Sequence, residues 1–145
     1  MKNSNTSLSY GLTVLSANCQ GLRNYTKRMD VLTYLKDTNA SIVCLQDTHL
    51  LDSDKSSIRQ IWPDCYINGS KTNSRGVVTL LNNNFEYTVL NTFKDDDGNL
   101  LQTLIDCGNF KLNLINVYAP NRDSPSFFSK VMQLADDDNA DFDMW

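Results

Sequence analysis

The fold is decided by residues 12–46, which read LTVLSANCQGLRNYTKRMDVLTYLKDTNASIVCLQ. Residues 12–18 predict a strand, because β-branched and apolar residues run toward a turn signal at Gly21. Residues 24–38 predict a helix that begins at a capping asparagine and carries apolar residues three and four positions apart. Residues 41–46 form a short apolar run that suits a strand buried on both faces. A strand, a helix and a strand in this order predict a βαβ unit with two parallel strands.

The middle of the chain predicts a short helix and a series of antiparallel strands. The helix covers residues 53–61 and ends before Pro63, and two strands follow from Cys65 and Gly76. Three further strands are expected at residues 85–93, 100–107 and 110–118, joined by hairpin turns at residues 95–99 and 108–109. The acidic turn Asp95-Asp-Asp-Gly98 lacks the spacing of a calcium loop, so we expect a solvated turn.

The C-terminal part predicts one more helix and the opening of a strand. Ser124 and Pro125 are typical of a helix start, and residues 142–145 resemble the beginning of a strand. The expected apolar face of this helix consists of Phe127, Phe128, Val131, Met132 and Leu134. Together the elements predict an α+β fold with a mixed, mostly antiparallel sheet and flanking helices.

The composition is that of one globular domain, which we place at residues 11–145 after a polar tail at residues 1–10. The apolar runs are too short to span a bilayer and the first ten residues are too polar for a signal peptide, which favours an intracellular, nuclear or cytoplasmic protein.

The four cysteines have no metal-site spacing and are expected to be reduced thiols. The net charge is −4, but five of the 17 acidic residues lie in the last ten positions. Residues 1–135 therefore carry about +1 and do not exclude a nucleic-acid partner.

Polar residues close the two strands of the predicted βαβ unit. Asn18 ends the first strand and Asp47 follows the second, and parallel strands place both residues at the same edge of the sheet. An amide oxygen and a carboxylate there could hold a hard cation such as Mg²⁺. The alternative is that Asn18 forms an Asx turn and that Asp47 caps a turn or helix.

A third polar cluster follows a later strand, in the sequence Asn116-Val-Tyr-Ala-Pro-Asn121. The Tyr118 hydroxyl can donate a hydrogen bond to a phosphate oxygen, and Asn121 can do so from a loop that Pro120 stiffens. The alternative is a tyrosine packed in the core beside a Pro-Asn turn.

Four motifs in order resemble the endonuclease/exonuclease/phosphatase superfamily: SANCQGLR at residues 16–23, LQDTH at 45–49, GVVTLL at 76–81 and NVYAPN at 116–121. The residues of these motifs are most similar to those of the endonuclease domain of non-LTR retrotransposons, a relative of the exonuclease III type apurinic endonucleases. The resemblance covers about residues 12–134.

This resemblance implies a hydrolase that uses Mg²⁺, which Mn²⁺ can replace, to cut a phosphodiester bond in DNA by in-line attack of water. It implies no membrane and no small-molecule cofactor, and the remainder of a parent polyprotein, which could include a reverse transcriptase, is a candidate partner. The roles that it implies are metal binding by Asn18 and Asp47, catalytic phosphate contacts by Tyr118 and Asn121, and DNA-backbone contacts by Arg23 and His49.

The sequence departs from the family pattern in two ways. Asp47 stands where the family usually has Glu, and the family's Gly-Asp-x-Asn motif and catalytic Asp and His pair are not among the 145 residues, whose only histidine is His49. We therefore expect the first part of a two-sheet, four-layer sandwich, truncated and inactive by itself. The alternatives are a non-catalytic relic or binding module, or a phosphatase of the same superfamily. The family fold packs two sheets face to face, and we expect this chain to supply mainly the first of them. The inner face of that sheet would then lack its partner and expose an apolar patch, with candidates Val14, Val43, Leu45, Val78, Leu80 and Leu114.

Overall fold

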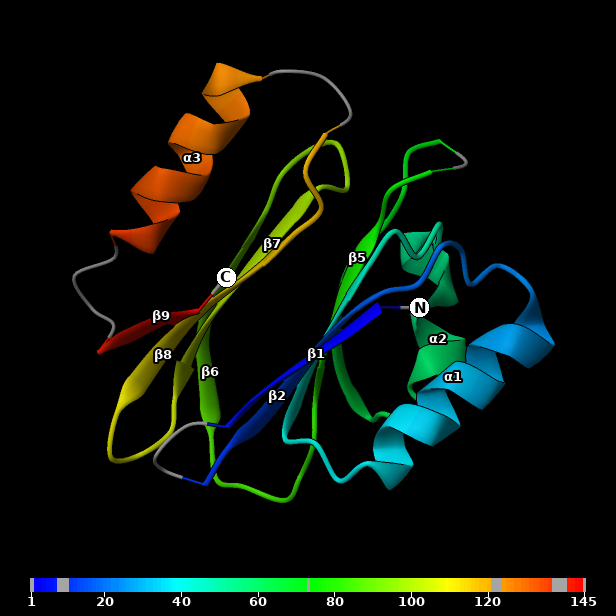
Figure 1. Cartoon of the computed structure of the whole chain (residues 1–145), viewed down its shortest axis with the longest axis horizontal. Helices are drawn as coiled ribbons and strands as arrows, with labels where there is room; N and C mark the ends of the chain where they lie inside the picture. Colours follow the sequence, from blue (N-terminus) through cyan, green and yellow to red (C-terminus); the bar gives the residue numbers. More distant parts are fainter. Residues whose placement is uncertain (1, 8–10, 73, 121–123, 137–140, 145) are drawn as a thin grey trace.

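The computed structural model describes residues 2–7, 11–72, 74–120, 124–136 and 141–144, and their strands form two sheets that face each other (Figure 1). The five-stranded sheet has the order β1 (Lys2–Ser7), β2 (Thr13–Asn18), β3 (Ile42–Gln46), β5 (Val77–Leu81) and β4 (Asp64–Asn68). The four-stranded sheet has the order β6 (Thr88–Lys94), β7 (Leu100–Asp106), β8 (Lys111–Val117) and β9 (Phe142–Met144).

The predicted βαβ unit is confirmed at the centre of the first sheet. Strands β2 and β3 are parallel, and helix α1 (Tyr25–Asp37) connects them. Asn24 is the helix cap, and its side chain accepts a hydrogen bond from the Lys27 amide at 2.9 Å. Strand β1, which pairs antiparallel with β2, consists of polar residues that sequence analysis left outside the domain as a tail. An edge strand can form from polar residues because its ladder uses only backbone groups.

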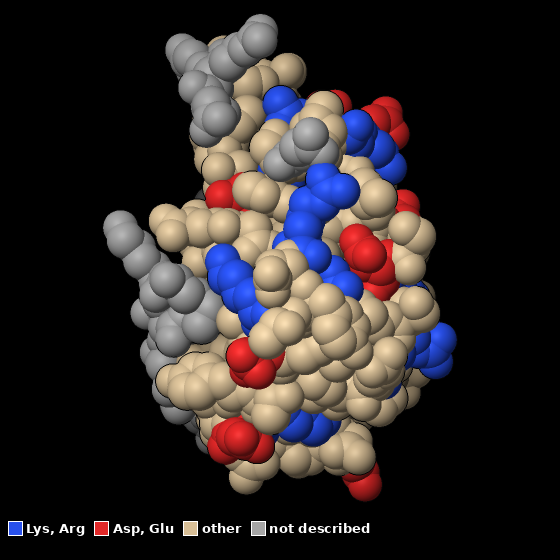
Figure 2. Space-filling view, turned by 90° about the vertical axis from the view of Figure 1, so that its right-hand side faces the viewer, with Lys and Arg blue, Asp and Glu red and all other residues tan. Residues whose placement is uncertain are grey.

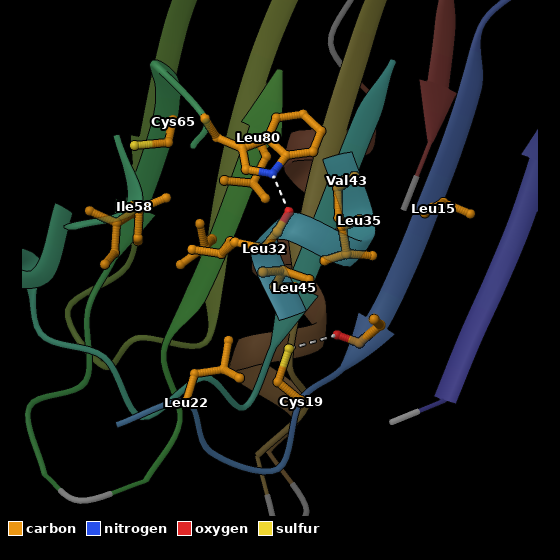
Figure 3. Close-up of a cluster of buried hydrophobic side chains, with 14 of the residues drawn as sticks. Leu15, Cys19, Leu22, Leu32, Leu35, Val43, Leu45, Ile58, Cys65 and Leu80 are labelled. Carbon is orange, nitrogen blue, oxygen red and sulfur yellow. Dashed lines mark hydrogen bonds between the residues drawn. The ribbon is translucent and has the colours of Figure 1, made fainter. Parts of the chain in front are cut away.

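Helices cover the outer face of the first sheet (Figure 3). The 3-10 helix η1 (Asp52–Asp54) runs into the short helix α2 (Lys55–Ile58), so the predicted helix is present but shorter. Leu32 and Leu35 of α1 and the buried Trp62 pack on the strands, and the Trp62 indole Nε1 donates to the Leu32 carbonyl oxygen at 3.1 Å. This cluster fixes the helices on the sheet by burying apolar surface.

The second sheet covers the inner face of the first, so the expected exposed patch is wrong. Val14 and Leu114 lie together in the core between the two sheets, with side chains such as Ile42, Ile105 and Leu112. The other four candidates belong to the helix side of the first sheet: Val43, Leu45, Val78 and Leu80. The physical reason is that residues 88–117 form a separate sheet that stacks on the first instead of extending it.

Helix α3 (Pro125–Ala135) packs on the outer face of the second sheet and completes four layers. Val131 and Ala135 are buried against this sheet, whereas the predicted core residues Phe128 and Met132 are 48% and 51% exposed. The apolar face of α3 is therefore narrower than predicted. The final strand is confirmed, because β9 pairs parallel with β8.

All four cysteines are free, and three of them are buried: Cys19, Cys44 and Cys65. Burial raises the pKa of Cys44 to about 12, which keeps its thiol protonated at neutral pH. In the part of the chain that the structure describes, no helix combines the length and the apolar character needed to cross a membrane.

Candidate functional site

Several loops meet at one edge of both sheets, in the upper part of Figure 1, and we call this the polar edge. It comprises residues 18–24, 47–51, 69–72, 74–76, 95–99 and Tyr118. The parallel strands β2 and β3 end here, and β5, which runs antiparallel to β3, begins here. The Gly76 amide donates to the Gly98 carbonyl at 2.9 Å, and the Tyr118 amide donates to the Asn99 carbonyl at 2.8 Å. Backbone bonds thus join loops of the two sheets.

Asn18 and Asp47 both lie at the polar edge, as expected for the ends of two parallel strands. Asn18 pairs in register with Gln46, and the Gly21 amide donates to the Asp47 carbonyl at 2.8 Å. The Asn18 side-chain oxygen also accepts the Gln20 amide at 3.2 Å, which is the Asx turn that the sequence left open. The alternative readings are compatible, because an amide oxygen in a turn can still face a cation.

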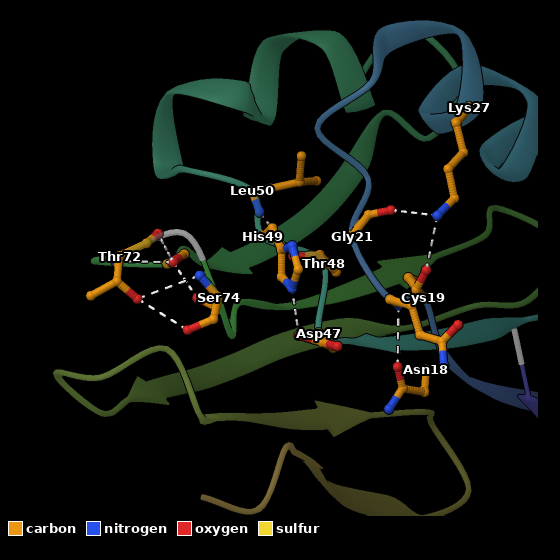
Figure 4. A network of polar contacts seen from close by, with 12 residues as sticks. Asn18, Cys19, Gly21, Lys27, Asp47, Thr48, His49, Leu50, Thr72 and Ser74 are labelled. Carbon is orange, nitrogen blue, oxygen red and sulfur yellow. Dashed lines mark hydrogen bonds and ion pairs between the residues drawn. The ribbon is translucent and has the colours of Figure 1, made fainter. Parts of the chain in front are cut away.

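The side chains of Asp47 and His49 are in direct contact at the polar edge (Figure 4). The His49 Nε2 lies 2.7 Å from the Asp47 Oδ1, and the side chains are 27% and 16% exposed. On the other side of the ring, a Cβ atom on Gly21 would lie 2.9 Å from the His49 Nδ1. The imidazole is therefore held between a carboxylate and a close backbone.

Strained backbone is concentrated at the polar edge. Five non-glycine residues have positive φ in the described part of the chain, and four of them lie here: Gln20 (53°), Asp47 (54°), His49 (60°) and Arg75 (70°). Such conformations cost on the order of 1–3 kcal/mol each and persist where the surrounding structure enforces them. The concentration marks this edge as a candidate functional site.

Cationic side chains support the loops of the polar edge. Lys27 of α1 donates from Nζ to the carbonyl of Gly21 at 2.7 Å and to that of Cys19 at 3.3 Å. Figure 2 shows the side that carries α1 and α2, where Lys and Arg side chains follow a broken line over the upper half. Asp52 approaches two more cations, Lys94 at 3.6 Å and Lys71 at 3.9 Å. Of these cations, Lys27 holds the loop that follows β2 directly, through its two carbonyl contacts.

The remaining predicted site residues differ in how the structure places them. Tyr118 is half-buried just after β8, and Arg23 is exposed in the loop after β2. Asn121 lies outside the described residues. The resemblance placed His49 near the DNA backbone, and the structure turns its Nε2 toward Asp47.

Sequence reasoning missed the roles of Gln46 and Asn116. Asn116 is 2% exposed in β8, and its Oδ1 accepts from the Gln46 Nε2 of β3 at 2.9 Å. The sequence pattern that could have indicated this role is an asparagine in the apolar strand Lys111–Val117, on the same face as Leu112 and Leu114, which lie between the two sheets. A buried amide of this kind needs hydrogen-bond partners, which here come from the other sheet.

A divalent cation is compatible with the donors at this edge. Among the described residues, no three or more His, Cys, Asp or Glu side chains cluster as a metal site. Magnesium, however, keeps several waters and often takes only one or two carboxylates from the protein. Asp47 supplies a carboxylate with two acceptor oxygens and Asn18 an amide oxygen, so these residues fit a site completed by water and phosphate. Burial raises the pKa of the neighbouring Cys19 to about 12, so its thiol is not an available thiolate ligand.

Two facing sheets between helical layers, with polar strand ends gathered at one edge, define the class of four-layer α/β sandwiches. The chain belongs to the Endonuclease/Exonuclease/phosphatase family, whose sequence profile matches residues 15–143.

Relatives agree with this membership. A Xenopus laevis protein, the transposon TX1 uncharacterized 149 kDa protein, is 31% identical over an alignment of 135 residues that covers 89% of this chain and 10% of that protein. The AP endonuclease LMAP from Leishmania major has a TM-score of 0.57 at 16% identity, over 86% of this chain and 44% of that one. The endonuclease domain of TRAS1, a telomere-specific non-LTR retrotransposon, has a TM-score of 0.57 at 12% identity, over 83% of this chain and 52% of that one. The chain thus spans about half of these solved structures and a tenth of the transposon protein.

Proposed function

We propose that this chain provides the N-terminal half of the active site of a metal-dependent DNA endonuclease. The observation that supports this function is the placement of Asn18 and Asp47 at the ends of two paired parallel strands, at the same edge as the end of the strand that leads to Tyr118. The names of two relatives, a transposon protein and a retrotransposon endonuclease domain, support DNA as the substrate. In this proposal the remainder of a retrotransposon polyprotein, with its reverse transcriptase, is the natural partner.

The proposed roles divide between metal binding and phosphate binding. Asn18 and Asp47 hold Mg²⁺, which Mn²⁺ can replace, and the bound ion would offset charge on the phosphoryl group. His49 orients the Asp47 carboxylate through the 2.7 Å contact. Tyr118 donates its hydroxyl to a phosphate oxygen, Asn121 is assigned a phosphate contact from the family resemblance, and the exposed Arg23 contacts the DNA backbone.

The proposal predicts metal-dependent binding of DNA. A labelled DNA duplex followed by fluorescence anisotropy should bind more tightly with Mg²⁺ than with EDTA, because the ion links carboxylate and phosphate. Asp47→Ala should remove this difference, whereas Asp30→Ala, an exposed acid on α1, should keep it. Equal binding with Mg²⁺ and EDTA by the unaltered chain would contradict the proposed function.

We further propose that these 145 residues alone do not cleave DNA at a useful rate. In the family that this sequence resembles, an Asp activates the attacking water and a His stabilises the charge of the phosphate. These residues have no counterpart among the 145 residues. Supercoiled plasmid incubated with the purified chain and Mg²⁺ should therefore nick no faster than with Asp47→Ala. Nicking that requires Mg²⁺ and is abolished by Asp47→Ala would overturn the proposed inactivity and leave the nuclease assignment in place.

A further inference from the structure

Asn116 connects the two sheets immediately below the polar edge. It belongs to β8 of the second sheet, and among the described residues the hydrogen-bond partners of its side chain belong to the first sheet. Its Nδ2 donates to the carbonyl oxygens of Val78 at 2.9 Å and Leu45 at 3.2 Å. Leu45 and Val78 are register partners on β3 and β5, so one amide contacts two neighbouring strands.

Gln46 extends this contact to a third strand of the first sheet. The Gln46 Nε2 donates to the Asn116 Oδ1 at 2.9 Å and to the Ser16 Oγ of β2 at 3.0 Å. The Asn116 Nδ2 also lies 3.3 Å from the Thr79 Oγ1. A network of four polar side chains therefore spans β2, β3, β5 and β8.

The hydrogen bonds of this network are directional, whereas the contacts of the surrounding apolar core are not. Apolar contacts between sheets are non-directional and tolerate small sliding movements. A buried amide loses its partners when the sheets slide, and an unpaired buried amide is costly. The network therefore fixes the position of one sheet relative to the other.

The network lies next to the proposed site residues on both sheets. Asp47 directly follows Gln46, and Tyr118 follows Asn116 by two residues, which places Tyr118 on the side of the chain that Asn116 occupies. A displacement of about 1 Å between the groups that hold metal and phosphate lowers the efficiency of a site strongly.

We propose that Asn116 is a positioning residue that holds the metal-binding edge of the first sheet in place against the strand that leads to Tyr118. The expected effect on metal binding rests on the proposed function. The expected effect on the position of the two sheets rests on the hydrogen bonds of Asn116.

Asn113 provides a matched control on the same strand. It is also fully buried, its Oδ1 accepts from Gln102 at 2.8 Å, and its Nδ2 donates to the Leu134 carbonyl of α3 at 2.6 Å. It faces the opposite side of the second sheet, and among the described residues its side chain makes no hydrogen bond to the first sheet. Asn113→Ala and Asn116→Ala thus remove the same group from the same strand.

The test measures two quantities in the unaltered chain and in both variants. The first is the affinity for Mn²⁺ by electron paramagnetic resonance, and the second is the amide hydrogen exchange of Gly21, His49 and Tyr118. We expect Asn116→Ala to weaken Mn²⁺ binding by about tenfold, as for residues that orient metal ligands. It should also reduce the protection of these three amides, whereas Asn113→Ala leaves both quantities nearly unchanged.

The possible outcomes separate this inference from the proposed function. If Asn116→Ala and Asn113→Ala behave alike in both measurements, the positioning role is wrong. If the unaltered chain does not bind Mn²⁺, the proposed metal site fails, and the exchange data alone decide the positioning role. If Asn116→Ala does not fold, Gln46→Met removes the donor to the Asn116 Oδ1, together with the Gln46 contacts to Ser16 and Cys44, and keeps the Asn116 side chain in place. It should give a smaller loss of the same protection, and unchanged protection would overturn the inference.

Discussion

The side chains of Asp47 and His49 meet with 2.7 Å between Oδ1 and Nε2, and both residues have left-handed backbones. The contact engages the carboxylate that we propose as a metal ligand. Two strained residues in three positions are maintained here by backbone bonds, because the His49 amide donates to the Arg75 carbonyl at 2.7 Å. The surrounding backbone therefore holds Asp47 and His49 in the conformation that brings their side chains together.

Removal of the imidazole should destabilise the polar edge. We expect His49→Ala to lower the free energy of unfolding by about 1–2 kcal/mol, because a partly buried hydrogen bond to a carboxylate is lost. His49→Gln, which keeps a donor, should lose less. Urea unfolding of the three proteins measures the difference, and equal stability of His49→Ala and the unaltered chain would show that the contact contributes nothing.

Gly21 should resist substitution more strongly than a glycine with the same backbone elsewhere. Gly21 and Gly108 have φ of 90° and 87°, but a Cβ atom would lie 2.9 Å from the His49 ring only at Gly21. Gly108→Ala should cost about 1–2 kcal/mol for the left-handed backbone alone. Gly21→Ala should cost about 1–3 kcal/mol more, because the ring must move. Thermal unfolding of both variants tests this, and equal losses would mean that His49 is not held against Gly21.

The acidic turn between β6 and β7 should depend on its first aspartate. The Asp95 Oδ1 accepts the Asn99 amide at 3.0 Å and the Asn68 Nδ2 at 2.8 Å, so this turn is not simply solvated as the sequence suggested. Asp95→Ala should lower stability by about 2–3 kcal/mol, because Asn68 is buried and loses a charged partner. The exposed Asp96 is the control, and Asp96→Ala should change stability by less than about 0.5 kcal/mol. A similar effect of both variants in urea unfolding would contradict the role of Asp95.

High pH should destabilise the chain through its buried thiols. Burial raises the pKa of Cys19 and Cys44 from 9.0 to about 12. Above pH 9 the unfolded chain releases these protons and the folded chain retains them, so stability falls as pH rises from 9 toward 12. Each thiol contributes at most about 1.4 kcal/mol per pH unit in that range. Urea unfolding across this range should show a shallower decline in Cys44→Ala than in the unaltered chain, and parallel declines would exclude the thiol of Cys44 as a cause.

Much of the fold was predictable from local patterns. The Asn24 cap and the apolar spacing of residues 25–37 are sufficient to predict α1, and the turn residues at 95–99 predict the β6–β7 hairpin. The faces of the strands were not predictable in the same way. Strand Ile42–Gln46 is apolar on both sides, so its sequence does not say that Val43 faces the helices and Ile42 faces the second sheet.

The candidate site was predictable where it depends on strand direction. Parallel strands brought Asn18 and Asp47 to one edge, as expected. The contact of Gln46 with Asn116 joins residues 70 positions apart in the sequence and depends on how the two sheets stack. No local sequence pattern predicts that stacking. The orientation of His49 depends on a positive φ, which a histidine in a sequence does not reveal.

The central claim is that Asn18 and Asp47 together bind a divalent cation at the polar edge, and direct titration with Mn²⁺ tests it. Mn²⁺ prefers the same oxygen ligands as Mg²⁺ and is visible by electron paramagnetic resonance. We expect Asn18→Ala and Asp47→Ala each to weaken Mn²⁺ binding by about tenfold or more, and Asp30→Ala to leave it unchanged. The same Mn²⁺ affinity in the unaltered chain and in both site variants would contradict it.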